Sequence, residues 1–192
     1  MFSSPSLDRD HRTLIEATET GWWYTSQLAH NERVVAFHTD DCDPSSKYAR
    51  KQEGFLDMLR NTTQISQIIE DNDYRLVSGI GTNYPRCTAA GSSFLEPFGD
   101  ESDQWCAVGD AAIAFDPLSS QGMITALRMG CSVGIMLSKQ LQQGDFDDTV
   151  ESIDFNFVKT LFEDTRKDYE KKRLYFYKQS MFDGDFWQRR RN

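Results

Sequence analysis

The sequence predicts a mixed α/β (α+β) fold, with an antiparallel-rich sheet in the first half of the chain and long helices in the second. Aromatic and β-branched runs flank a polar turn early in the chain, which is typical of a β-hairpin. Between Met123 and Leu141, apolar residues and glycines recur every three or four positions, which is the period of an amphipathic helix.

Length and charge limit the classes of protein to consider. The chain has 192 residues, 39% of them hydrophobic, which is enough for a packed core in one domain or slightly more. Its 30 acidic and 21 basic residues give a net charge of -9, which disfavours a nucleic-acid binder. No apolar run approaches the roughly 20 residues that span a membrane, and the first residues do not resemble a signal peptide. We therefore expect a cytoplasmic protein.

The first hundred residues contain most of the expected strands. Residues 13–20 are predicted to form one strand, and residues 22–25 and 34–38 the two arms of a hairpin. Residues 74–80 and 86–90 are further candidates, the second of them ended by a Gly-Ser-Ser segment. These strands would form the antiparallel-rich sheet.

Helices are predicted between the strands and in the second half. Asp43 followed by proline is a typical helix start, and apolar residues at helical spacing follow it: Phe55, Met58, Leu59, Ile65, Ile68 and Ile69. The helix over 123–141 contains Gly130 and Gly134, which predicts close backbone packing because glycine costs about 1 kcal/mol in a helix interior. A last helix is expected over 154–177, with the charged run 163–173 on its solvated face.

One motif could carry chemistry. Residues 105–108 are predicted to form a buried strand that ends in Gly109-Asp110-Ala111-Ala112, and Asp116-Pro117-Leu118-Ser119-Ser120-Gln121-Gly122 precedes the long helix. A carboxylate at a strand end can accept hydrogen bonds from ligand hydroxyls, and the free amides of a first helical turn favour an anionic or electron-rich group. Glycine lets a planar ligand approach the backbone. The alternative is an ordinary strand–loop–helix connection with Ser119 or Ser120 as N-cap.

This string resembles the second flavin-binding motif of the para-hydroxybenzoate-hydroxylase-like FAD-dependent oxidoreductases, in particular the tryptophan-halogenase-like and FAD-dependent monooxygenase-like branch. Residues 109–112 and 116–122 match that motif in order and spacing. Weaker similarities lie in the aromatic hairpin, residues 21–24 and 33–37, and in residues 186–190, which look like the C-terminal end of the family.

The resemblance implies an FAD cofactor and a set of residues that bind it. Asp110 would bind the ribityl chain or a nearby hydroxyl, and the amides near Gly122 would face the pyrimidine edge of the isoalloxazine. Pro117 and Leu118 would line the ring. The complete set of implied cofactor-binding residues is Gly109, Asp110, Pro117, Leu118, Ser120, Gln121, Gly122 and Met123. No residue is assigned a catalytic role.

The family's N-terminal Rossmann unit, with its Gly-x-Gly-x-x-Gly loop, has no clear counterpart. The segment Gly79-Ile80-Gly81-Thr82-Asn83-Tyr84 has tyrosine at the third glycine position. The sequence therefore looks like a C-terminal half in three parts: a substrate-domain-like mixed sheet (1–100), the second FAD-motif strand–loop–helix (101–145) and a C-terminal helix and tail (146–192). We expect exposed apolar surface around residues 105–108 and the glycine-bearing helix face, where the absent half would dock.

Two main functions follow from the resemblance. The first is part of a monooxygenase or halogenase that acts on a small organic molecule, with aromatic compounds among the candidates. The second is a non-catalytic remnant or interaction domain that needs a partner, or a homo-oligomer, to complete it. A geranylgeranyl-reductase-like flavoenzyme is a third reading that shares the Gly-Asp feature.

Other candidate sites are weaker. His11, His30 and His38 are far apart, and the four cysteines, Cys42, Cys87, Cys106 and Cys131, form no CxxC pair, so no metal site is predicted. The acidic residues at positions 40, 41 and 43 look like a capped, solvated turn. Trp22, Trp23 and Tyr24 could stack on an aromatic substrate, although core packing is the preferred reading because large aromatics dominate cores.

Overall fold

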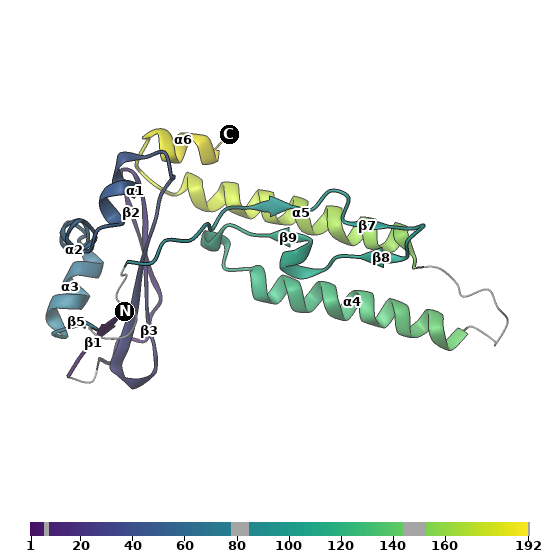
Figure 1. Ribbon diagram of the computed structural model, residues 1–192, viewed down its shortest axis with the longest axis horizontal. Helices are drawn as coiled ribbons and strands as arrows, with labels where there is room; N and C mark the ends of the chain where they lie inside the picture. The colour runs from purple at the N-terminus through teal and green to yellow at the C-terminus, as the bar shows by residue number, and fades with distance from the viewer. Residues whose placement is uncertain (6–7, 78–84, 144–152, 192) are drawn as a thin grey trace. The chain divides into compact units, whose positions relative to one another are not determined.

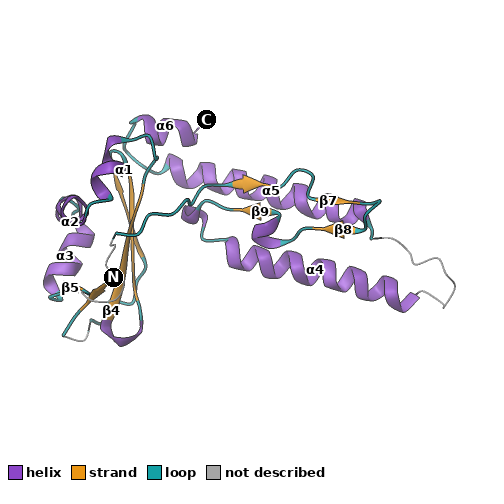
Figure 2. Ribbon diagram, in the orientation of Figure 1, coloured by secondary structure: helices purple, strands orange, loops and turns teal. Residues whose placement is uncertain are grey.

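The computed structural model describes residues 1–5, 8–77, 85–143 and 153–191. The chain forms two compact units. The first, unit 1, combines Met1–Thr88 with Ser180–Asn192, and the second, unit 2, is Ala89–Gln179. Figure 1 labels most of the helices and strands, and Figure 2 distinguishes helices from strands. These units divide the chain at other positions than the predicted bounds at 100 and 145, because strands on the two sides of residue 100 pair within unit 2.

Unit 1 is built on a five-stranded sheet with the strand order β2-β3-β4-β1-β5, in which all pairs are antiparallel. The predicted hairpin is confirmed, with Trp23 opposite Phe37 and Thr25 opposite Val35. The strands are β1 (Phe2–Ser3), β2 (Leu14–Thr18), β3 (Gly21–Gln27), β4 (Glu32–His38) and β5 (Arg75–Leu76).

Three helices follow the hairpin: α1 (Pro44–Ala49), α2 (Gln52–Arg60) and α3 (Gln64–Asp71). The predicted start of α1 is confirmed, because the Asp43 carboxylate accepts a hydrogen bond from the Ser45 amide at 2.8 Å. At the start of α3, the Glu16 carboxylate on β2 accepts hydrogen bonds from the amides of residues 63–65. A strand residue therefore caps this helix and ties it to the sheet.

The core of unit 1 lies between the sheet and these helices. Trp23 is 1% exposed, and its ring centroid lies 4.8 Å from that of Phe37 and 5.0 Å from that of Phe55. Trp22 points to the opposite face of the sheet, since neighbouring strand residues alternate, and stacks on His38 at 3.8 Å. Both tryptophans are buried, so core packing describes them better than a substrate-stacking surface does.

The short helix α6 (Asp185–Arg191) completes unit 1 from the far end of the chain. The Trp187 indole donates a hydrogen bond to the carbonyl of Thr18 at 2.9 Å. Arg189 and Arg190 both pair with the Asp40 carboxylate at 2.6 Å. Burial alone would raise the pKa of Asp40, but the two guanidinium groups outweigh it and hold that pKa below its ordinary value.

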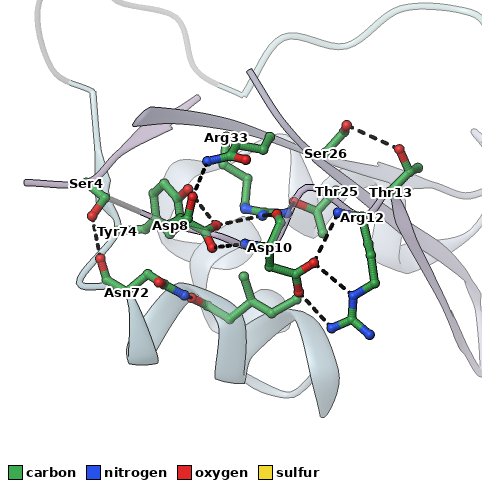
Figure 3. Close-up of polar contacts among 12 residues, drawn as sticks. Ser4, Asp8, Asp10, Arg12, Thr13, Thr25, Ser26, Arg33, Asn72 and Tyr74 are labelled. Carbon is green, nitrogen blue, oxygen red and sulfur yellow. Dashed lines mark hydrogen bonds and ion pairs between the residues drawn. The ribbon is translucent and has the colours of Figure 1, made fainter. Parts of the chain in front are cut away.

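A buried ion pair joins the N-terminal segment to the sheet. The Arg33 side chain is 0% exposed and donates to Asp8 and to the Asp10 carbonyl, both at 2.7 Å. The Tyr74 hydroxyl also donates to the Asp8 carboxylate, at 2.8 Å (Figure 3). Burial would raise the pKa of Asp8, but these donors and the Asp10 amide outweigh it and lower that pKa.

Unit 2 consists of two long helices with short strands between them (Figure 1). Ile113 is buried together with Met129 and Phe162, which come from the two helices, and forms the core with them. The elements are β6 (Ser93–Phe94), which pairs with β9 (Ile113–Ala114), β7 (Gly99–Asp100), which pairs with β8 (Trp105–Cys106), the helices α4 (Gly122–Gln143) and α5 (Phe155–Lys178), and the 3-10 turns η2 (Gly109–Ala111) and η3 (Pro117–Ser119).

The two long helices are confirmed, whereas several predicted strands are wrong in extent. Residues 86–90 form no strand and are exposed, and the strand lies at Ser93–Phe94 instead. Of residues 105–108, only the first two form a strand, and Trp105 is 41% exposed rather than buried. Of residues 74–80, only Arg75–Leu76 is a strand, and residues 78–80 lie outside the described residues. Each of these short strands pairs with its partner over two residues.

None of the helices in the described part of the chain has both the length and the apolar character that a bilayer crossing requires.

We expect Asp8→Ala to destabilise the protein by about 3–5 kcal/mol at neutral pH, because it leaves the buried Arg33 without its counter-charge. Since the pKa of Asp8 is lower in the folded state than its unfolded value of about 3.9, the ionised carboxylate stabilises the fold above that pH, and this contribution is lost as the pH falls through the folded pKa. Urea denaturation at several pH values would measure both effects.

The control is Arg12→Ala, which breaks the exposed pair of Arg12 with Asp10 and should change the midpoint little. An Asp8→Ala variant with the stability of the wild type, or one whose deficit grows toward acid pH, would contradict this account.

Candidate functional site

The segment between η2 and α4 begins at a position that requires glycine. Gly109 has a φ of +61°, a conformation that side-chain-bearing residues rarely adopt. A β-carbon there would lie 2.9 Å from the Ala126 β-carbon on α4. The backbone therefore turns sharply against the first turns of α4, and the turn carries Asp110 to the surface.

The side chain of Asp110, a residue of η2, lies beside the first residue of α4. A β-carbon at Gly122 would be 3.6 Å from the Asp110 Oδ1 atom, so the carboxylate stands beside the first helical residue. The first backbone hydrogen bond of the helix runs from the Thr125 amide to the Gln121 carbonyl at 2.9 Å. The amides of residues 122–124 precede it and therefore have no acceptor within the helix. An exposed carboxylate and a helix N-terminus thus share one surface.

The loop before α4 is organised by Asp116. One carboxylate oxygen of Asp116 accepts from the Leu118 amide at 2.9 Å and so caps η3. The backbone carbonyl of Asp116 accepts a hydrogen bond from the Ser119 hydroxyl at 2.9 Å. The same hydroxyl accepts a hydrogen bond from the Gln121 amide at 3.4 Å. These bonds fold residues 116–121 into a compact connection that ends at the helix.

Two tyrosines of α5 hold Asp116 in place. The Tyr177 hydroxyl donates to the second carboxylate oxygen at 2.6 Å, and the Asp116 amide donates to the Tyr169 hydroxyl at 3.0 Å. Both tyrosines are 1% exposed. Burial raises the pKa of Tyr169, so its hydroxyl stays protonated near neutral pH.

The structure gathers the predicted site residues into one surface segment, with different degrees of exposure. Asp110, Pro117, Ser120 and Met123 are exposed, and Met123 is 85% exposed. Ser120 adopts a left-handed conformation with φ of 51°. Leu118, Gln121 and Gly122 are half-buried, and Gly109 is buried. Asp110 lies in the turn η2 rather than at the end of a buried strand.

Sequence reasoning missed Tyr169 and Tyr177. Tyr169 lies inside the charged run 163–173, which predicted only a solvated face. A signal was present, because the two tyrosines are eight positions apart and therefore share a face of a helix. The spacing alone does not indicate which residue the two hydroxyls contact, so it gave no reason to connect the tyrosines to the loop.

The face of α4 that carries Gly134 is open. A β-carbon at Gly130 or at Gly134 would meet nothing within 4 Å, so the predicted close packing at these glycines is wrong within the described residues. Large apolar side chains on the helix are exposed, among them Leu127 at 69%. We call the set Ile124, Leu127, Cys131, Gly134 and Ile135 the open face of α4. It agrees with the expected exposed apolar surface.

The remaining candidates have structural partners. Asp40 pairs with arginines of α6, Asp41 pairs with Arg50, and Asp43 caps α1. The glycine-containing segment 79–84 lies outside the described residues.

Known proteins resemble this chain at the level of sequence and of fold. No family model matches the chain. A protein of Marinomonas mediterranea named "Putative FAD-dependent oxidoreductase LodB" is 28% identical over 117 residues, which is 61% of this chain and 30% of that protein. Among solved structures, CmlS, a flavin-dependent halogenase, aligns with a TM-score of 0.69 and 22% identity over 100% of this chain and 34% of its own. The chain has the fold of part of a flavin-dependent halogenase.

A second solved structure agrees. QhpG, a peptidyl tryptophan dihydroxylase essential for tryptophylquinone cofactor biogenesis, aligns with a TM-score of 0.66 and 16% identity over 94% of this chain and 39% of its own. The resemblance to FAD-dependent oxidoreductases and the mixed α/β fold class are thereby confirmed. The chain spans about a third of the length of each of these relatives.

We expect Gly109→Ala to lower stability by about 1–2 kcal/mol from backbone strain, and by more if Ala126 cannot move. Gly122→Ala should be tolerated, because a β-carbon there meets only the Asp110 oxygen at an ordinary contact distance. The measurement is the midpoint of thermal unfolding of each variant, compared with that of the wild type. Equal midpoints would contradict the assigned strain.

Proposed function

We propose that this chain supplies the isoalloxazine-facing part of an FAD site in an oxidoreductase of the monooxygenase or halogenase class. The observation that carries the proposal is the exposed Asp110 carboxylate beside the free N-terminal amides of α4, within residues that match a flavin motif. The sequence similarity to an FAD-dependent oxidoreductase supports the same cofactor.

The residues present suit such a ligand. Asp110 is exposed and can accept hydrogen bonds from ribityl hydroxyls, which a buried, paired aspartate such as Asp116 could not do. Gly122 has no side chain to hold a flat ring away from the backbone. The positive end of the α4 dipole favours negative charge at the pyrimidine edge of the ring. When bound, the flavin would supply the redox chemistry itself.

The substrate side is proposed to involve the sheet of unit 1. A small organic molecule is the expected substrate class, with hydroxylation, halogenation and dehydrogenation as the candidate reactions. Because Trp22 and Trp23 are buried, neither offers a ring face to an aromatic substrate. The cytoplasm remains the proposed location, and the four free cysteines, all in described residues, suit a reducing compartment.

The open face of α4 is proposed to dock the dinucleotide-binding unit that completes the FAD site. That unit would be supplied by another part of a longer chain or by a separate chain. Exposed Leu127 and Ile135, with no side chain between them at Gly134, form a surface on which another element can lie closely. A non-catalytic interaction domain or a homo-oligomer would use the same surface without a bound flavin.

Asp110→Ala should weaken FAD binding about 10-fold to 150-fold in the presence of a dinucleotide-binding unit. The reason is the loss of a charged acceptor for a ligand hydroxyl, worth about 1.5–3 kcal/mol. Isothermal titration would measure the change, with Asp164→Ala on the exposed side of α5 as the matched control.

Two results would contradict the proposal. One is unchanged FAD affinity in Asp110→Ala. The other is tight FAD binding by the isolated wild-type chain, because a site without a pyrophosphate cradle should not overcome the ordering cost of binding.

Leu127→Glu should abolish association with the dinucleotide-binding unit and leave stability within about 0.5 kcal/mol, because the side chain is exposed and packs on no core. Sedimentation of mixtures would measure association. Lys159→Glu, an exposed change on α5, controls for the added negative charge. Unchanged association in Leu127→Glu would exclude the open face as the docking surface.

A further inference from the structure

The Tyr177 side chain is buried, and its hydroxyl donates to the Asp116 carboxylate at 2.6 Å. A buried hydroxyl is costly unless it is paired, so this bond favours the observed position of the side chain. Tyr169, two turns earlier on the same face of α5, takes the Asp116 amide. Asp116 is therefore hydrogen-bonded to both tyrosines, to Tyr169 through its backbone amide and to Tyr177 through its carboxylate.

A continuous series of hydrogen bonds runs from Tyr177 to the start of α4. The carboxylate that Tyr177 contacts also accepts from the Leu118 amide. The Asp116 carbonyl holds the Ser119 hydroxyl, which accepts in turn from the Gln121 amide. Gln121 directly precedes the helical amides that would face the flavin ring. Tyr177 is therefore connected to these amides through the loop.

We infer that Tyr177 is a positioning residue for the flavin site, and that it fixes, through Asp116, where the first amides of α4 stand. The inference rests on the proposed function for the ligand, but the anchoring of the loop is a property of the chain itself. Tyrosine is needed at this position for its hydroxyl, because phenylalanine would fill the same space without holding the carboxylate.

The decisive variant is Tyr177→Phe, with Tyr175→Phe as its matched control. Tyr175 lies on the same helix and is 62% exposed, so the same atom is removed outside the loop contact. The first measurement is amide hydrogen exchange in the chain without ligand. We expect exchange at residues 118–121 to become about tenfold faster in Tyr177→Phe, since one hydrogen bond to a charged group is worth at least a factor of this size. The central turns of α5 should keep their exchange rates.

The second measurement is the affinity for lumiflavin, an isoalloxazine without the ribityl chain or pyrophosphate, followed by shifts of the amide resonances of residues 121–124. We expect weak binding to the wild type, about tenfold weaker binding to Tyr177→Phe, and unchanged binding to Tyr175→Phe. A residue that only stabilised the fold would leave this affinity unchanged while the protein remains folded. Asp116→Asn combined with Tyr177→Phe should lose less than the product of the two single effects, because both act through one contact.

The outcomes separate the two hypotheses. Unchanged loop exchange in Tyr177→Phe would overturn the anchoring, and so would unchanged lumiflavin affinity when the wild type binds it. If the wild type shows no lumiflavin shifts at residues 121–124, the proposed function fails, and loop exchange alone decides the anchoring: faster exchange supports it. If Tyr177→Phe does not fold, Asp116→Asn tests the same contact with both measurements.

Discussion

The contact between the Tyr177 hydroxyl and the Asp116 carboxylate is the interaction on which the candidate site depends. Asp110, Met123 and Ile124 are exposed and Gly122 is half-buried, so little packing fixes the positions of these residues. Their geometry must therefore come from the loop beneath them. That loop contains a capped 3-10 turn and a left-handed Ser120, neither of which is held by a large core. Two buried tyrosines hold this loop in place beneath the candidate site.

The two units rely on different forces. Unit 1 joins an aromatic core to a buried ion pair, Asp8 with Arg33, and to contacts of α6 with the carbonyl of Thr18 and the carboxylate of Asp40. Unit 2 has a smaller buried cluster and leaves one side of α4 uncovered. Buried side-chain contacts that order unit 2 therefore include those between α5 and the loop before α4. The exposed side chains of the open face bury little apolar surface within the unit.

The sequence predicted those features that depend on local periodicity. The hairpin, the start of α1, and the helices α4 and α5 follow from alternation, capping and the 3.6-residue period, so they could be found without a structure. Residues 86–90 and 105–108 could not be assigned correctly, because two-residue strands leave no periodic signal and depend on which segment lies opposite. The motif located Asp110 and Gly122, but the importance of Tyr169 and Tyr177 comes from contacts 53 and 61 positions apart in the chain.

The return of α6 to unit 1 has a consequence for biosynthesis. The sheet of this unit leaves the ribosome before unit 2, but Phe186 and Trp187, which are buried in the same unit, follow only after the whole of unit 2 has been translated. Unit 2 is contiguous and can therefore close during translation. Unit 1 is consequently translated in two parts, before and after unit 2. Until its second part has been translated, the carbonyl of Thr18 lacks its hydrogen bond from the Trp187 indole.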